Sequence, residues 1–400
     1  MREHPLPGTR PDRDRYDVVV VGARAAGAAV AMLLAGAGLS VLAVDRGRYG
    51  SDTPSTHALM RGGVAQLTRW GLLDRLVDLG TPAVHRTVFH YAHGEIIVPI
   101  TPGAGVEALY APRRTVLDPV LVDAAVAAGA EVRHGVAVTG LLVDDHGRVG
   151  GVRARTRAGT VPIAARLVIG ADGVRSTVAA AVRAQDLHRG AHGSAVVYGY
   201  WAGVEAAGYE WAYRGGVGAG FIPTNGGEVC VFAGGPPERI RRGGPAVLAD
   251  VLARASPGMA ARLGAGARRG VVRTQPGRPG HLRRAHGPGW ALVGDAGSWK
   301  DPLTAHGLTD ALRDAELLAR AVAVGFGDDR AEDSALAGYQ EVRDRLALPL
   351  LAVSDEIAGC GWADDEVPAL LLRLSRVMSA GVEVVTGLPD DRLVASGVPT

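Results

Sequence analysis

The chain has 400 residues, of which 47% are hydrophobic and 57 are glycine. This length is sufficient for two domains with buried cores. The 43 Lys and Arg residues nearly balance the 41 Asp and Glu residues, giving a formal net charge of +2. That balance argues against an electrostatic nucleic-acid binder, which needs a clustered basic face.

The two cysteines and the N-terminal segment indicate the cellular compartment of the protein. Cys230 and Cys360 form no metal or redox motif, which favours a reducing, cytoplasmic location. Arg24 and several glycines interrupt the apolar span 18–44, so we predict neither a signal peptide nor stable membrane insertion. Residues 1–15, rich in Arg, Asp and Pro, are expected to form a flexible tail.

The first informative segment has the pattern of a strand, a tight turn, a helix and a second strand. Four valines precede Gly22, which allows a sharp turn, and Gly27 lets the following helix pack closely on the sheet. The helix N-terminus suits a pyrophosphate, and Asp45 at the end of the second strand suits a ribose hydroxyl. Arg24 stands where the dinucleotide pattern has its middle glycine, so its side chain either points away or pairs with a phosphate. The alternative is a strand–helix turn that binds nothing.

Two further signatures also follow apolar strands. Residues 167–176 contain an Ala-Asp-Gly turn, and residues 290–296 contain a Gly-Asp-Ala turn. The later one continues to His306, where a helix is expected to begin and to point its N-terminus at a ring or phosphate. A Gly-Asp turn after a strand is common, but three such strand ends around one sheet predict one cofactor pocket.

Stretches rich in aromatic and β-branched residues lie between these segments, and they are typical of an antiparallel sheet. They are residues 87–91, 95–100, 196–201 and 227–232. We therefore predict two domains followed by helices. The ranges are 16–80, 108–182 and 270–325 for the first domain, 83–107 and 185–268 for a substrate-binding β-sheet domain, and 333–400 for a C-terminal helical segment.

The three motifs resemble those of the group A flavoprotein monooxygenases of the para-hydroxybenzoate hydroxylase type. The resemblance covers most of residues 16–325. It implies an α/β fold, with a Rossmann-like FAD-binding domain of the glutathione-reductase type, an inserted antiparallel β-sheet domain and C-terminal helices. It also implies FAD as cofactor and NAD(P)H and O₂ as co-substrates. Arg24, Ala305 and Thr309 depart from the family pattern.

The resemblance also implies roles for individual residues. Asp45 would bind the ADP ribose, Asp295 the ribityl and pyrophosphate side, and Asp172 both FAD and NAD(P)H. Arg114 matches the arginine that precedes the family's Leu-x-x-x-Leu helix. The other cofactor-binding positions implied are Gly22, Ala25, Ala26, Gly27, Arg46, Gly173, Gly294, Pro302, Ala305, His306 and Gly307.

The implied reaction is hydroxylation or epoxidation of an apolar, aromatic or polycyclic small molecule in specialised metabolism, through a flavin C4a-hydroperoxide. His57, in a loop expected beside the flavin, is the candidate catalytic acid or base, and an equal alternative is that it only holds the loop. The candidate substrate contacts, for which simple core packing is the alternative, are Tyr200, Trp211, Tyr213 and Phe221.

Two other functions remain open. A flavin-dependent reductase or dehydrogenase, as in the geranylgeranyl-reductase-like branch, has the same fold. A degenerate flavin-fold binding protein would explain Arg24 and Ala305. Lys300 is the only lysine, which argues against the flavin halogenases that rely on an N-terminal lysine. His90 and His93 would face opposite sides of a strand, so no metal site is predicted.

Overall fold

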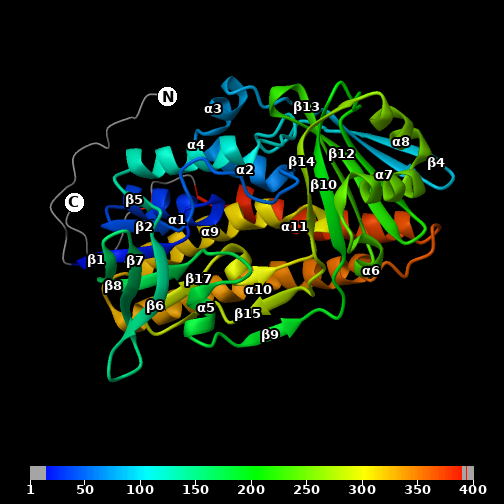
Figure 1. Cartoon of the computed structure of the whole chain (residues 1–400). Helices are drawn as coiled ribbons and strands as arrows, with labels where there is room; N and C mark the ends of the chain where they lie inside the picture. Colours follow the sequence, from blue (N-terminus) through cyan, green and yellow to red (C-terminus); the bar gives the residue numbers. More distant parts are fainter. Residues whose placement is uncertain (1–14, 390–392, 394–400) are drawn as a thin grey trace.

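The computed structural model describes residues 15–389 and 393, and its two large sheets lie at opposite ends of the molecule (Figure 1). The first sheet runs in the order β16-β17-β8-β1-β2-β5, with β7 on β8 and β6 on β7. Its strands are β1 Arg15–Val21, β2 Val41–Asp45, β5 Glu131–His134, β6 Ala137–Val143, β7 Val149–Thr156, β8 Gly159–Gly170, β16 His286–Gly287 and β17 Trp290–Leu292. The central strands are unbroken apolar runs because helices or strands cover both of their faces.

The register of the first sheet brings the three sequence signatures to one edge. Val21 at the end of β1 pairs with Val44 of β2 and Gly170 of β8, and Gly170 pairs with Leu292 of β17. These strands are parallel, so their carboxyl ends meet at the same edge of the sheet. The turns that follow β1, β2, β8 and β17 therefore leave the sheet side by side.

Helices cover the first sheet and supply the largest buried cluster of the described residues. The helices beside it are α1 Ala25–Gly36, α2 Arg61–Arg69, α3 Leu73–Asp78, α4 Arg114–Ala127, α5 Thr177–Ala181 and α9 Gly307–Gly325. Helix α1 packs against α4 and α9, and its alanines allow that close approach.

The second sheet runs in the order β14-β10-β13-β12-β11-β3-β4. Its strands are β3 Arg86–Tyr91, β4 Gly94–Pro99, β10 Ala195–Ala202, β11 Tyr209–Arg214, β12 Val217–Thr224, β13 Glu228–Gly235 and β14 Ala267–Gln275. One face joins the core shared with α1 and α9, and the other is covered by α7 Gly244–Ala255 and α8 Pro257–Gly264 (Figure 1). The predicted fold class is thus confirmed.

Two details of the second sheet differ from the prediction. Strands β11 and β3 are parallel, because the chain reaches β11 through a long excursion rather than a hairpin. Residues 270–275, assigned from sequence to the first domain, lie in β14 at the edge of the second sheet, where they pair with β10. Strand β14 contains three arginines and is mostly exposed, and its sequence gave no sign of this pairing.

Of the remaining elements, β9, β15 and α10 lie along the lower side of Figure 1. A small sheet joins β9 Asp186–Arg189, β15 His281–Arg283 and β18 Ser298–Trp299. Short helices are α6 Pro237–Ile240 and the single turns Asn225–Gly227, Gly294–Ala296 and Pro302–Thr304. The long helix α10 Asp329–Ala358 packs on α9, and α11 Val367–Thr386 packs on α10 and α2.

Parts of two expected segments, the tail 1–15 and the helical segment 333–400, lie outside the described residues. Of the tail, Arg15 is described and begins β1. Among the described helices, none is long and apolar enough to cross a membrane.

Candidate flavin site

The glycines of the three signatures lie against one another. A Cβ built on Gly22, whose φ is +101°, would lie 2.4 Å from the carbonyl oxygen of Ala171. A Cβ on Gly27 would lie 1.8 Å from the carbonyl oxygen of Gly22, and one on Gly294 would lie 3.0 Å from the Ala26 side chain. The turns after β1, β8 and β17 are therefore in direct contact, and only glycine permits the approach at Gly22 and Gly27.

The start of α1 leaves backbone donors for an anion. No side chain caps this helix, and Arg24 at the N-cap points elsewhere. The first-turn N–H groups belong to Ala25, Ala26 and Gly27. Uncapped N–H groups at a helix start suit a pyrophosphate.

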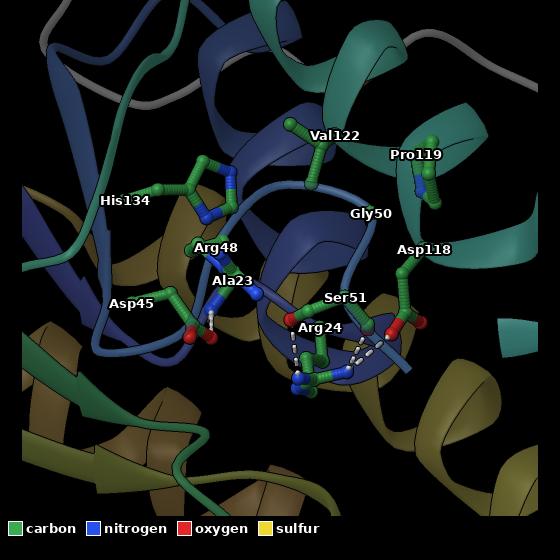
Figure 2. Close-up of a pocket in the computed structure, with 10 residues that line it drawn as sticks. All are labelled: Ala23, Arg24, Asp45, Arg48, Gly50, Ser51, Asp118, Pro119, Val122 and His134. Carbon is green, nitrogen blue, oxygen red and sulfur yellow. Dashed lines mark hydrogen bonds and ion pairs between the residues drawn. The ribbon is translucent and has the colours of Figure 1, made fainter. Parts of the chain in front are cut away.

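Asp45 lies beside this turn and organises it. Its carboxylate accepts hydrogen bonds from the backbone N–H of Ala23, at 2.9 Å, and of Gly47, at 2.6 Å. Figure 2 shows Asp45, Ala23, Arg48 and His134 around one recess. Both His134 ring nitrogens are buried without a hydrogen-bond partner among the described residues, and burial lowers the pKa of this histidine. A neutral imidazole there offers one donor and one acceptor to a bound group.

Arg24 does not face the turn that it interrupts. Its guanidinium bonds the Asp118 carboxylate at 3.1 Å and the Ser51 carbonyl oxygen at 3.1 Å (Figure 2). Arg114 makes a two-pronged ion pair with the same Asp118, at 2.8 and 3.1 Å. Asp118 thus pairs with both arginines, and the side chain that replaces the middle glycine is directed to Asp118 and Ser51.

Asp172 and Asp295 present carboxylates at the same edge of the sheet. Asp172 Oδ2 accepts the Thr177 N–H at 2.6 Å, while its buried Oδ1 has no hydrogen-bond partner in the described structure. Burial raises the pKa of Asp172. Burial also raises the pKa of Asp295 to about 6, against the lowering influence of Lys300 and Arg114.

The loop before α9 joins these parts. A Cβ on Gly307 would lie 3.9 Å from the Asp295 carboxylate, so α9 begins next to that residue. Ala305 adopts a left-handed φ of +50°, the conformation that the family's glycine adopts without strain. Asp301 accepts hydrogen bonds from Leu303 and from the backbone and hydroxyl of Ser194, at 2.7–3.0 Å, which ties the loop to the second sheet.

A buried ion cluster lies under this loop. The Lys300 ammonium pairs with Asp310 at 2.8 Å, and Asp310 also binds His306 and Arg313, at 3.0 and 2.7 Å. The lysine and arginine hold the pKa of Asp310 well below its usual range although burial acts in the opposite direction. The Lys300 ammonium is therefore held in a buried ion pair and is not available to react with an oxidant.

His57 lies where the two sheets meet. It is 1% exposed, has a left-handed φ of +68°, and its Nε2 is hydrogen-bonded to the Tyr200 hydroxyl. The Arg113 guanidinium lies 3.5 Å from the centre of the Tyr200 ring. Burial, with Arg113 and Arg114, holds the pKa of His57 well below its usual value. The next turn is fixed to α9 by a 3.0 Å bond from the Met60 N–H to Thr309.

The other candidate substrate contacts divide between the two faces of the second sheet. Trp211 and Tyr213 are on the face of Tyr200, where both are buried, and the Tyr213 hydroxyl donates to the Leu303 carbonyl at 2.9 Å. Phe221 is on the opposite face with α7 and α8, where Arg262 covers its ring. Alternation along β12 causes this, so we remove Phe221 from the proposed substrate contacts.

The structure also shows where the remaining predicted cofactor-binding residues lie. Gly173 has a left-handed φ of +81°, and Pro302 begins the single turn before Ala305. Arg46 is exposed after β2. Their contacts with FAD stay predictions, as do those of the other site residues.

The residues fit FAD chemically. The uncapped N–H groups at the start of α1 suit a pyrophosphate, and carboxylates lie at the end of β2 and after β8 and β17. The recess beside Asp45 holds about 10 Å³, roughly one water. Arg48 is an exposed side chain at this recess.

Comparisons with known proteins agree with this class of site. A family of FAD binding domains matches residues 15–353, so the chain belongs to that family. It is an FAD-dependent oxidoreductase.

The proteins similar to this chain include a reductase, a brominase and a probable monooxygenase. A digeranylgeranylglycerophospholipid reductase of Methanosarcina mazei is 28% identical over 343 residues, covering 79% of this chain and 77% of the relative. The flavin-dependent brominase Bmp2 has a TM-score of 0.78 at 19% identity, over 92% of this chain and 94% of that one. PqsL, a probable FAD-dependent monooxygenase of Pseudomonas aeruginosa, has a TM-score of 0.73 at 20% identity, over 91% and 100%. These two structures show the shared fold.

Sequence reasoning missed several residues that shape the site. Asp118, Arg113 and His134 carry no motif of their own, and only the fold brings them to Arg24, Tyr200 and Asp45. For Asp118 a signal was present: it follows Arg114 by four residues, the spacing of an ion pair on one helix face.

Proposed function

We propose that the protein is an NAD(P)H-dependent FAD monooxygenase that hydroxylates or epoxidises an apolar, aromatic or polycyclic small molecule. FAD, once bound and reduced, supplies the chemistry of oxygen activation. The chain binds the cofactor, orients the substrate and provides hydrogen-bonding groups near the aromatic face of the second sheet.

The hydrogen-bonded pair of His57 and Tyr200 carries this proposal. Because its pKa is held low, His57 is unprotonated at neutral pH, and its Nε2 is hydrogen-bonded to the Tyr200 hydroxyl. Burial raises the pKa of Tyr200, so this hydroxyl is a poor source of protons. The pair is therefore a poor proton donor at neutral pH, which favours a monooxygenase, because oxygen transfer from FAD needs no proton delivered to substrate carbon. A double-bond reductase needs the reverse, a proton delivered to carbon.

We expect His57→Asn and Tyr200→Phe to lower kcat for hydroxylation by about 10²-fold, the usual cost of misplacing the reacting groups by about 1 Å. FAD content should stay unchanged, because neither residue lies among the three glycine turns. The wild-type kcat should show no step near pH 6.5, because the His57 pKa lies well below that value. Oxygen uptake and product formation against a panel of hydroxylated polycyclic aromatics measure both. A protonation step between pH 6 and 7 that disappears in His57→Asn would contradict the proposal.

The second candidate is a flavin-dependent reductase of a substrate double bond, and the relatedness over 79% of the chain to an archaeal reductase favours it. The two differ in their need for oxygen. A monooxygenase consumes O₂ with substrate and places one atom of labelled O₂ in the product. Product formation without air, with two hydrogen atoms added to an isoprenoid double bond, would establish the reductase instead.

A further inference from the structure

Strand β4 forms one edge of the second sheet, at the right-hand margin of Figure 1. Within residues 15–389 and 393 it pairs only with β3, and all six of its residues are exposed. Ile96, Ile97 and Val98 have exposed fractions of 51%, 58% and 42%. Among the described residues, no other large apolar side chains with this exposure are consecutive in the chain. Because side chains alternate along a strand, β4 presents apolar groups to solvent on both of its faces.

The free edge of β4 also carries unpaired backbone groups. The N–H of Ile100 donates to the carbonyl oxygen of His85 at 2.8 Å, which marks one hydrogen-bonded pair of the β3–β4 ladder. Such pairs alternate along an antiparallel ladder, so every second residue of β4 directs its backbone groups away from β3. These residues are Glu95, Ile97 and Pro99. Proline has no N–H, so its place in this set removes no bond from the ladder to β3.

The opposite edge of the same sheet is protected against pairing, whereas β4 is not. Strand β14 has a bulge where its register with β10 shifts, and it carries the adjacent Arg268 and Arg269. Bulges and charged side chains keep a further strand from pairing with an edge. Strand β4 instead pairs with β3 in one unshifted register over six residues and contains neither lysine nor arginine. Its one charged residue, Glu95, is paired with His90 at 2.8 Å.

The sequence of β4 is complementary to a second copy of itself. When two copies pair antiparallel about a twofold axis at Ile97, this residue lies opposite its own copy and Ile96 lies opposite Val98. Each Glu95 N–H then meets the C=O of Pro99 of the other copy. The two Glu95 carboxylates lie about 14 Å apart along the strands, which exceeds the screening length at physiological ionic strength.

A lipid surface fits this edge less well than a second strand does. The outward N–H groups of Glu95 and Ile97 find no acceptor in hydrocarbon, where an unpaired backbone group is costly. The Glu95 carboxylate also repels anionic headgroups. A second β4 strand satisfies these N–H groups and covers the apolar side chains at the same time.

We propose that β4 is a self-association edge, through which two copies of this chain pair strand to strand and join their second sheets into one continuous sheet. The proposal does not depend on the reaction that the protein catalyses. We expect one strand per copy to bury less than the roughly 1,200–2,000 Å² of a stable interface. The dimer should therefore be reversible, with a Kd in the micromolar range.

Sedimentation velocity of the flavin-loaded protein, from low to high micromolar concentration, measures the Kd of the dimer. Ile97→Lys places like charges opposite each other at the axis. Ile97→Pro removes the outward N–H and leaves the ladder to β3 intact. The matched control is Val271→Lys, because Val271 is an exposed valine on β14, at the other edge of the same sheet. Flavin content and the urea midpoint show whether each variant is folded.

We expect the wild type to dimerise, and both Ile97 variants to raise the Kd by at least about tenfold. Their flavin content and urea midpoint should match those of the wild type at a concentration where the wild type is monomeric, and Val271→Lys should dimerise normally. Mild oxidation locates the contact. Ile97→Cys should form a covalent dimer, whereas Val271→Cys, which shares the native Cys230 and Cys360, should not.

A wild type that stays monomeric at high micromolar concentration would overturn the proposal. A dimer that keeps the wild-type Kd in both Ile97 variants would do so too, as would equal cross-linking of Ile97→Cys and Val271→Cys. Flotation with vesicles of phosphatidylcholine and phosphatidylglycerol tests the other occupant. Vesicle binding by a monomeric wild type that is lost in Ile97→Lys would show that the edge faces lipid and not a second copy.

Discussion

The Asp295 carboxyl has a folded-state pKa of about 6, above the ordinary value of 3.8. Between these two pH values the unfolded chain has released this proton while the folded protein retains it, so the stability that this group provides at low pH is lost as pH rises. We expect Asp295→Asn to raise the unfolding free energy of the FAD-free protein by about 2–3 kcal/mol at pH 7.5, with no gain below pH 4. Thermal denaturation at several pH values measures this difference.

The same residue has the opposite effect on the cofactor. If Asp295 accepts a ribityl hydroxyl, Asp295→Ala should weaken FAD binding by about 1.5–3 kcal/mol, and Asp45→Ala should do so through the ADP ribose. Flavin fluorescence during dialysis measures retention. Full FAD occupancy in Asp295→Ala would contradict the role implied for the late turn.

Single residues were predictable from sequence where a motif places them directly after a strand. Asp45, Asp172 and Asp295 follow parallel strands, and their spacing alone brings them to one edge. Phe221 shows the limit, since its face depends on the exact phase of β12. The ion pair of Arg24 with Asp118 could not be predicted, because Asp118 lies 94 residues away in the chain.

At the scale of elements, α1 depends on one glycine and not on another. A methyl group at Gly27 would overlap the Gly22 carbonyl, whereas nothing lies within 4 Å of a methyl group at Gly36 at the other end of the helix. We expect Gly27→Ala to abolish FAD binding and to destabilise the fold. Gly36→Ala should stabilise it by about 0.5–1 kcal/mol. Urea denaturation and flavin content of both variants test the pair, and a Gly27→Ala protein that retains FAD would refute the close-packed turn.

Most elements could be anticipated because their periodicity is local. The apolar runs of β1, β8 and β13 and the helical pattern of α9 are visible in sequence. Pairing between distant strands is not local. The parallel contact of β3 with β11, and the attachment of β14 to β10, depend on where long connections return.

At the scale of the whole molecule, the start of α10 is joined to the first sheet by ion pairs of the buried Glu332 and of Asp329. The Glu332 side chain is 4% exposed. It pairs with Arg148, directly before β7, at 2.9 Å, and with Arg166, on β8, at 3.3 Å. We expect Glu332→Gln to lower the unfolding free energy by about 2 kcal/mol, because Arg148 and Arg166 lose their buried charged partner and keep only the exposed Asp329. Glu341→Gln, at an exposed position on the same helix, is the control for urea denaturation. Equal midpoints for the two variants would show that the attachment is not ionic.

The burial of Lys300 has a practical consequence for chemical labelling. It is the only lysine of the chain, and its ammonium is 3% exposed and paired with Asp310. An amine-reactive reagent reaches this nitrogen only when the loop before α9 opens. The rate at which Lys300 acquires a label, followed by mass spectrometry of an Arg-bounded peptide, therefore reports opening of the loop, and bound FAD should slow that rate.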